Sequence, residues 1–165
     1  RAHFGTIFAP QVANYAKKHR KFMNDYALAF AEFSKATQRG DFLKGLEIET
    51  RMYKPLGALF GKYRILLCPT LPLPATKAGE SYVKRKLRIN GKPQHGIESW
   101  MITLCFNIMS RCPVMSMPSG LAGNGVPTGL SIVGKTYDDV SVFRAAAAFE
   151  RVRPWYRSPA LRPKL

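Results

Sequence analysis

Two serines and a pair of carboxylates are the side chains of this sequence that could carry nucleophilic or acid–base chemistry. Ser116 and Ser119 lie in PVMSMPSG, and Asp138 and Asp139 follow a second apolar run. A serine hydroxyl becomes a nucleophile when an adjacent base activates it. These serines instead lie in a strand-and-turn sequence, where hydroxyls ordinarily bond to the backbone. We therefore predict that both hydroxyls are structural.

The carboxylate pair and the nearby glycine-rich segment also have structural explanations. Asp138 and Asp139 stand directly before an apolar helical pattern, where the first N–H groups of a helix need acceptors, so we predict capping instead of acid–base catalysis. The segment Ser119–Gly125, SGLAGNG, is similar in composition to a phosphate loop. It lacks the Gly-Lys-Ser/Thr ending and precedes a strand, so no nucleotide site is expected.

The spacing of cysteines and histidines predicts neither a metal site nor a cofactor. The three cysteines are far apart in apolar surroundings, and the three histidines make no ligand spacing with them. Buried free thiols are typical of a reducing compartment, which favours the cytoplasm. The residues concerned are Cys68, Cys105, Cys112, His3, His19 and His95.

Two apolar strands should position the serines. Val114–Met117 and Leu130–Gly134 carry β-branched and sulfur-containing residues without helical spacing, and the connection Pro118–Thr128 is rich in Pro, Gly and Asn. Strands that are apolar on both faces belong in the middle of a sheet that helices cover. The sequence therefore predicts an α/β fold.

The N-terminal half of the chain reads as two long helices. Apolar residues recur every three or four positions from Pro10 to about Thr37, which predicts one helix with an aromatic stripe in the core. Asp41 should cap a second helix that runs from Phe42 toward Tyr63, with a kink or break at Pro55 and Gly57. The expected core residues include Tyr15, Phe22, Phe30 and Phe33 in the first helix and Leu43, Leu46, Met52, Leu59 and Phe60 in the second.

The remaining elements complete what we predict to be a single unit over residues 1–165. A short buried strand, Ile65–Cys68, enters a proline-rich loop, and Asn90-Gly91 ends a basic segment with the signal of a type I′ hairpin. Helices are predicted over Gly96–Ile108 and from Val140 to about Val152, before Pro154-Trp155.

Several motifs in order resemble the amidase signature family. PVMSMPSG, NGVPTGLSIVG, the Asp pair, an alanine-rich helix ending in Glu, and Pro-Trp follow the order of the family's C-terminal part, and ILLCPTLPLPA matches its upstream strand-then-P-T-x-P segment. The match runs from about Tyr63 to Tyr156. It implies the C-terminal portion of an α/β/α fold with a mixed central sheet. It also implies amide hydrolysis through a serine, a second serine in a cis peptide and a lysine, all upstream of the matched portion. On that basis we predict that this chain holds no catalytic residue and is inactive alone.

The resemblance also implies four residues of a substrate pocket. Pro69 and Thr70 match the segment that leaves the sheet near the family's cleft, and Trp100 and Met101 match a helix that faces the substrate. Without the family, the first pair is equally a rigid loop exit, and the second pair is more often core.

Three departures from the family pattern bear on that pocket. Ser131 stands where the family usually has Gln, and Phe106-Asn107 lies one residue further from Pro113 than in the common form. Met101 lies near the position of an aspartate in glutamine-using relatives. A general amidase acting on a small-molecule amide is therefore favoured over a glutamine-dependent transamidase.

The ends and the charge of the sequence lead to further expectations, and the net charge is +16. The chain begins at Arg1 without a leader, so we expect part of a longer protein with no secretory signal, and no apolar run is long enough for a membrane span. The charge suits a basic module that binds nucleic acid or an anionic surface, but no nucleic-acid motif accompanies it, so we do not expect that partner. A non-catalytic subunit of an amidase-like complex is the other alternative, and a homodimer stays open.

Overall fold

The computed structural model describes residues 2–94, 96, 99–109 and 111–159. The chain folds into two compact units, which are Arg1–Met52 with Gly79–Ile97, and Tyr53–Ala78 with Glu98–Leu165. That both belong to one domain stays a prediction. His95 lies outside the described residues.

The first unit begins with short helices where the apolar period predicts one long helix. α1 is Ala2–Ile7, α2 is Ala9–His19 and α3 is Asp25–Glu32, and a 3-10 turn, η1, covers Arg20–Phe22 between α2 and α3. The prediction of a single helix is therefore wrong, although Pro10 does lie in the first turn of α2 as expected.

A local cap interrupts the predicted helix. Met23 adopts an extended backbone, and the Asn24 side-chain oxygen accepts a hydrogen bond of 2.9 Å from the Ala27 N–H. An Asn side chain competes with the helix for backbone groups and is favoured at the first position of a new one. The apolar spacing continues through this break, which is why periodicity alone does not reveal it.

The aromatic stripe is only partly core. α2 packs against α3, and the rings of Phe30 and Phe33 lie 5.5 Å apart. Phe22, by contrast, is 77% exposed, and Tyr15 is also exposed. The break at residues 23 and 24 turns the helix axis, so residues of one stripe no longer share one face.

The helix α4, Asp41–Phe60, runs through Pro55 and Gly57 without the predicted break. A proline removes one helical hydrogen bond, but Leu56 and Phe60 in the following turns are buried and hold the helix to its core. Asp41 is the first helical residue and accepts from the Gln38 N–H at 2.9 Å, so it closes the preceding turn instead of capping. Two residues predicted as core, Leu43 and Leu46, are exposed.

A small hairpin belongs to the first unit. β2, Arg88–Ile89, pairs with β3, Lys92–Pro93. Asn90 and Gly91 between them have φ angles of 49° and 76°. Two positive φ values define the type I′ turn, so the hairpin signal of this dipeptide is confirmed.

Two contacts join the segment before this hairpin to α3. The Tyr82 N–H donates to the Tyr26 hydroxyl at 3.0 Å, and Lys84 forms an ion pair of 3.1 Å with Asp25. Residues far apart in sequence therefore make one unit.

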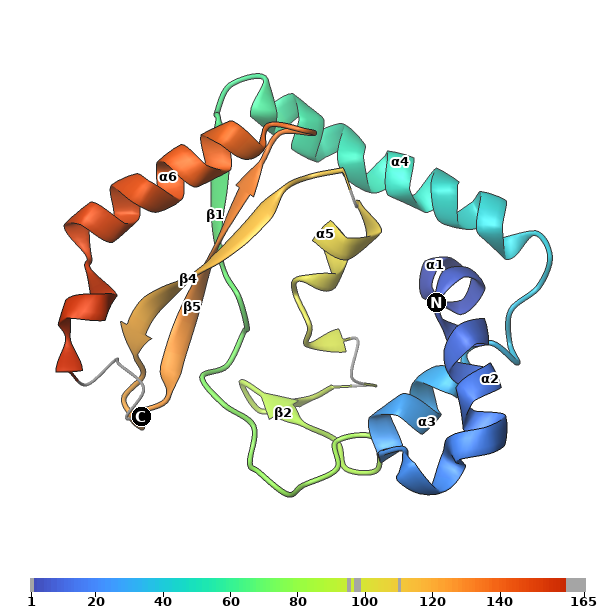
Figure 1. The fold of residues 1–165 in the computed structure, drawn as a ribbon. Coiled ribbons are helices and arrows are strands. Elements are labelled where there is room, and N and C mark those ends of the chain that lie inside the picture. Colours follow the sequence, from blue (N-terminus) through green and yellow to red (C-terminus); the bar gives the residue numbers. More distant parts are fainter. Residues whose placement is uncertain (1, 95, 97–98, 110, 160–165) are drawn as a thin grey trace. The chain divides into compact units, whose positions relative to one another are not determined.

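A three-stranded antiparallel sheet is the centre of the second unit (Figure 1). Its strands are β1, Ile65–Pro69, β4, Val114–Leu121, and β5, Pro127–Gly134, in the order β1-β5-β4. β5 therefore lies in the middle, as its continuous apolar sequence predicts. Helices and sheet together confirm the predicted α/β class.

The hairpin of β4 and β5 extends beyond the predicted strands. β4 continues past Met117 to Leu121 through an irregularity between Pro118 and Gly120, where Gly120 has a φ of 139°. A proline fits a strand at a bulge or an edge, and glycine tolerates this backbone conformation. Pro118 therefore marks a bend in β4 and not its end.

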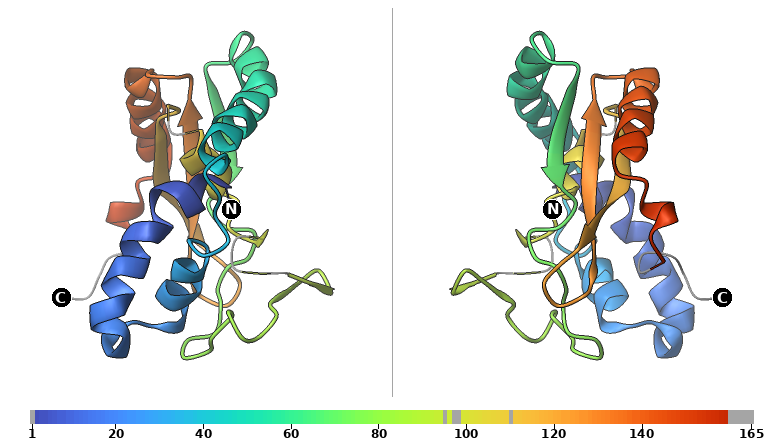
Figure 2. Two further views of the ribbon diagram at one scale, coloured as in Figure 1. Left: turned by 90° about the vertical axis from the view of Figure 1, so that its right-hand side faces the viewer. Right: turned by 90° about the vertical axis from the view of Figure 1, so that its left-hand side faces the viewer.

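The helix α6, Asp139–Val152, covers the sheet (Figure 2). It contacts β1, β4 and β5, and its Val142 and Ala146 pack with Ile132 of β5 in a buried cluster. Alanine on the helix allows the close approach that the sequence predicts. Ile65, Met115, Met117 and Ala145 surround the cluster.

The helix predicted over Gly96–Ile108 is much shorter in the structure. Among the described residues of this range, only α5, Leu104–Ile108, is an α-helix, and Trp100 and Met101 lie just before it. The Leu104 N–H donates to the Met101 carbonyl at 3.0 Å, which starts the helix there. Residues 97 and 98 of the predicted helix lie outside the described part.

We predict that the start of α6 makes stability depend on pH. Asp138 accepts from the Ser141 N–H at 3.1 Å. The Ser141 hydroxyl first, and then its N–H, lower the pKa of Asp138 below the ordinary 3.8. A lowered carboxyl pKa stabilises the fold above that value, and the contribution is lost as pH falls through the folded pKa. The melting temperature should therefore fall below about pH 4.

Asp138→Asn is the matched control for this prediction, because an asparagine keeps the capping oxygen and does not titrate. Thermal unfolding followed by circular dichroism between pH 3 and pH 6 should show a shallower acid slope for this variant. Identical slopes for the two proteins would assign the acid sensitivity to other carboxylates.

None of the described helices is both long enough and apolar enough to span a membrane.

Candidate functional site

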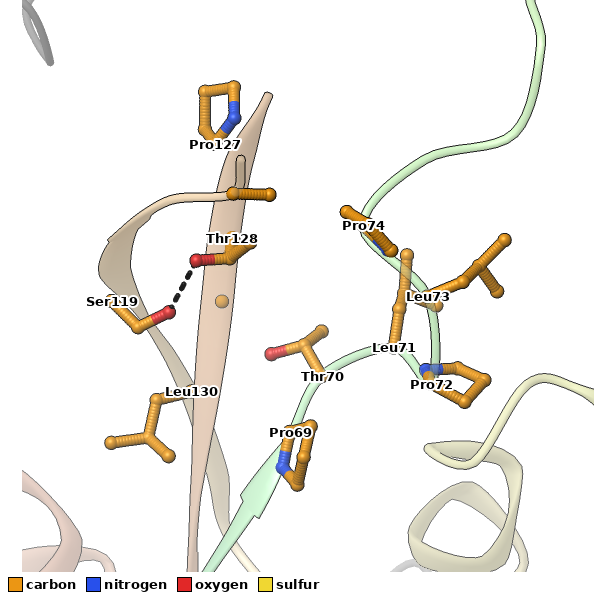
Figure 3. Close-up of a pocket in the computed structure, with 12 residues that line it drawn as sticks. Pro69, Thr70, Leu71, Pro72, Leu73, Pro74, Ser119, Pro127, Thr128 and Leu130 are labelled. Atoms are coloured by element: carbon orange, nitrogen blue, oxygen red, sulfur yellow. Dashed lines mark hydrogen bonds between the residues drawn. The ribbon is translucent and has the colours of Figure 1, made fainter. Parts of the chain in front are cut away.

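A cavity of about 590 Å³ opens in the second unit where the chain leaves β1 (Figure 3). The loop after β1 forms one wall, and the ends of β4 and β5 with their connection form the other. The residues that line it are Pro69, Thr70, Leu71, Pro72, Leu73, Pro74, Ser119, Ala122, Pro127, Thr128, Gly129 and Leu130.

Prolines make the loop wall rigid. Pro69, Pro72 and Pro74 fix three backbone φ angles, and none has an N–H group. The Thr70 N–H donates to the Gly129 carbonyl at 3.0 Å, which fastens the start of the loop to β5. The wall is therefore positioned before any ligand arrives.

A cluster of three hydroxyls joins this loop to the sheet. The Thr70 hydroxyl lies 3.1 Å from that of Ser116 on β4 and 3.1 Å from that of Ser131 on β5. Ser131 is 1% exposed. A side chain at Gly129 would place its Cβ 2.7 Å from the Thr70 oxygen, so the cluster requires glycine there.

A second pair of hydroxyls lies on the opposite wall. The Ser119 and Thr128 oxygens are 2.8 Å apart (Figure 3). The Thr128 hydroxyl also donates to the Gly120 carbonyl at 3.2 Å. These bonds close the end of the β4–β5 hairpin. Sequence reasoning assigned Ser119 to the turn, which the bond supports, but it did not connect Ser119 with the cavity.

The cavity is uncharged along its described lining. Burial raises the pKa of the Cys68 thiol, which precedes Pro69, and the neighbouring Cys105 raises it further. A thiol with a raised pKa is protonated near neutral pH and is a poor nucleophile. In the described part of the chain, no three His, Cys, Asp or Glu side chains come together as metal ligands.

Two of the four predicted pocket residues line this cavity. Pro69 and Thr70 are part of its wall, whereas the described lining does not include Trp100 or Met101. The sequence analysis did not predict that Thr128 and Leu130 line the cavity. The segment PTGL, with its hydroxyl and apolar side chains at the start of a strand, could have indicated a binding surface. Pairing of β1 with β5, which brings the two segments together, cannot be read from either segment alone.

The described partners of the candidate serine hydroxyls are other hydroxyls. Thr70 contacts Ser116 and Ser131, and Thr128 contacts Ser119. Neither a lysine nor a histidine, the usual activating bases for a serine hydroxyl, is among these described partners.

Comparison with known sequences finds a matching family model and several relatives. A family model described as Amidase matches residues 11–143, more than half of the chain. The A subunit of glutamyl-tRNA(Gln) amidotransferase from Thermosynechococcus vestitus is 27% identical over 140 residues, which are 85% of this chain and 26% of that protein. The same protein from Geobacter metallireducens is 28% identical over 143 residues, with 87% and 27% covered. The chain therefore spans about a quarter of the length of these relatives.

Solved structures give the same grouping. A bacterial aryl acylamidase of the amidase signature family superposes with a TM-score of 0.73 at 26% identity, over 99% of this chain and 36% of that one. A crystal structure of an amidase gives a TM-score of 0.72 at 20% identity, over 87% of this chain and 32% of the other. At 20% identity, the similarity to this amidase structure concerns the fold alone.

Proposed function

Because this chain belongs to the amidase family, we propose that it is the C-terminal portion of an amidase that hydrolyses a carboxylic amide through a serine acyl intermediate. In such an enzyme it supplies strands of the sheet and one wall of the substrate pocket. A preceding segment supplies the serine, the cis-serine and the lysine. The observation that supports this proposal is the cavity at the end of β1, found in a chain that matches the amidase family model.

The cavity wall has a passive part in the proposed reaction. Its prolines and leucines exclude water from a bound acyl or leaving group, and a rigid wall positions the amide for attack. Pro69 and Thr70 belong to this wall. Trp100 and Met101 are proposed to shape an apolar part of the same substrate pocket.

Alone, the chain is expected to be inactive. Ser116, Ser119 and Ser131 bond to hydroxyls, and their described partners include no base. A serine that keeps its proton does not attack an amide at a useful rate. Stabilising the oxyanion also requires hydrogen-bond donors aimed at the developing negative charge. We assign these donors to the preceding segment.

The exposed surface of the second unit supports a second candidate, a non-catalytic subunit that assembles with another polypeptide. β1 and β4 are the outer strands of the described sheet, and Leu67 of β1 is 54% exposed. Val140 and Phe143 on α6 are also exposed. Outer strands and apolar surface are places where further chain docks.

A serine-directed fluorophosphonate probe tests the proposal. Intact mass is measured for this chain and for an extended chain that carries the upstream serine–serine–lysine segment. Only the extended chain is expected to gain the adduct, with a heat-denatured sample as the control. Labelling of the 165-residue chain at one serine would contradict the assignment of the nucleophile.

The same probe separates the two candidates. If a serine-bearing polypeptide becomes labelled only when this chain is added as a separate molecule, the second candidate is favoured. Labelling that requires one continuous chain favours the C-terminal portion. Sedimentation of this chain by itself tests the homodimer.

A further inference from the structure

A run of basic residues lies at the end of α2 and in η1, within the first unit. Residues 17–22, KKHRKF, are all exposed, and neither α2 nor η1 contains an Asp or a Glu. None of the ion pairs between described residues involves this run. Its four lysine and arginine charges therefore have no acidic partner in the described part of the chain.

Aromatic rings stand among these charges. Tyr15 is 66% exposed and Phe22 is 77% exposed, so both rings can be reached from solvent. The Tyr15 and His19 rings lie 6.4 Å apart, and the Lys21 ammonium lies 4.9 Å from the centre of the Phe22 ring. Aromatic and cationic side chains are therefore interleaved over residues 15–22, which we call the aromatic–basic surface.

Two hollows adjoin this surface, and Asn14 and Lys17 line both. The smaller, of about 420 Å³, also contains the Tyr15 and His19 rings. The larger, of about 620 Å³, lies between α2 and the segment at the end of α3. The carboxylate in its described lining, Glu32, is already paired with a neighbouring lysine at 2.7 Å. A negatively charged group in either hollow therefore meets Lys17 and no unpaired carboxylate.

A partner for this surface has to carry several negative charges and planar groups. A nucleic-acid backbone carries one negative charge per phosphate, and its neutralisation by lysine and arginine is a large part of the affinity. The bases of a single strand are free to stack on aromatic rings, whereas those of a duplex stack on each other. The net charge of +16 also attracts such a polyanion at longer range.

Two other anionic partners fit less well. An anionic membrane binds a helix through an apolar face that enters the lipid. The apolar side of α2 instead packs against α3, and Ala9 on it is buried (Figure 1). An acidic peptide would neutralise the cations, but its carboxylates offer no planar bases to Tyr15 and Phe22.

We propose that the aromatic–basic surface binds single-stranded nucleic acid, with its lysines and arginine on the phosphates and Tyr15 and Phe22 stacked on bases. Such contacts tolerate many sequences. The surface lies in the first unit and requires nothing of the cavity in the second. The sequence alone gave no reason to expect this partner, because Tyr15 and Phe22 were predicted to be buried.

Fluorescence anisotropy of a labelled oligo(dT) with the 165-residue chain, at several salt concentrations, measures the binding constant. For a single strand, the logarithm of this constant falls with the logarithm of the salt concentration by about 0.7 for each phosphate contacted. Lys18→Gln with Lys21→Gln should therefore weaken binding and reduce the slope by about 1.4. Lys44→Gln with Lys54→Gln removes the same charge from exposed positions on α4 and should leave the slope nearly unchanged.

Replacement of the rings separates stacking from charge. Tyr15→Ala and Phe22→Ala keep the net charge, and each is expected to weaken binding by about fivefold to a hundredfold, the effect of losing one stacked base. Tyr15→Phe keeps the ring and should bind oligo(dT) as the unchanged chain does. Phe42→Ala on α4, at a residue that is 49% exposed, is the control outside the surface. Circular dichroism checks that each variant is folded.

Equal losses in the two lysine pairs, together with unchanged binding by both alanine variants of the surface rings, would assign the affinity to net charge and overturn the proposal. A duplex of the same length that binds as tightly as oligo(dT) would exclude stacking and also overturn it. So would binding of phosphatidylserine vesicles or of polyglutamate through these residues if oligo(dT) does not bind. Amide hydrolysis is not measured, so the fluorophosphonate probe decides the proposed function separately.

Discussion

Ile132→Ala is expected to lower the free energy of unfolding by about 2–5 kcal/mol. Ile132 is 1% exposed and packs with Val142 and Ala146 between the central strand and α6. Truncation removes buried methyl and methylene groups and leaves a cavity, because neighbours fixed by sheet hydrogen bonds cannot close around it. Urea unfolding followed by circular dichroism measures the loss.

Val152→Ala is the matched control for this truncation. Val152 lies in the last turn of α6 and is 78% exposed, so shortening its side chain should change stability by less than about 0.5 kcal/mol. A loss at Ile132 no greater than at Val152 would mean that α6 does not pack on β5 in solution.

Gly134→Ala is expected to destabilise the fold by about 1–3 kcal/mol. An added Cβ would lie 2.5 Å from a Val142 methyl group, 3.1 Å from the Asp138 carbonyl oxygen and 3.1 Å from Pro113. The backbone carbonyl cannot rotate away, so the end of β5 and the start of α6 must separate. The same urea titration measures the effect.

Gly123→Ala separates crowding from the general effect of replacing glycine. Nothing lies within 4 Å of a Cβ added at Gly123, in the connection between β4 and β5. An alanine there should be neutral or slightly stabilising, because it restricts the unfolded chain. Equal destabilisation at both glycines would contradict the close packing at Gly134.

The sequence predicted those elements whose signal is local. The central strand β5 followed from a run of apolar residues, the hairpin turn from Asn90-Gly91, and the start of α6 from Asp138. In each case the residues that carry the signal also make the bond or adopt the angle that forms the element. The family grouping was also correct, because several motifs occur in the right order.

The errors arose where a competing interaction was hidden by a regular pattern. Asn24 caps α3 and divides the predicted first helix, although the apolar spacing runs on. Of the kink or break expected at Pro55, the break does not occur, because buried residues of α4 on its C-terminal side outweigh one missing hydrogen bond. Periodicity reports which residues are apolar and not whether the backbone between them is continuous.

The sequence indicates only part of the cavity wall, and a role of that wall in substrate binding stays a prediction. Pro69 and Thr70 adjoin a strand whose exit is marked by proline, whereas the partners of Thr70 are Ser116 and Ser131, distant residues brought near by strand pairing. The segment before α5 that contains Trp100 was predicted as helix. The direction of the Trp100 side chain could therefore not be derived from the sequence.

The order of strands also sets an order of assembly. β4 and β5 are joined by residues 122–126, whereas β1 reaches β5 across residues 70–126. Closing a loop roughly ten times longer costs about 2 kcal/mol more in chain entropy, so the hairpin should form early and β1 should dock late. Folding rates should then respond to mutations in the hairpin and hardly to those in β1. The cavity lies at the seam between β1 and β5, so it exists only once the slowest contact has formed.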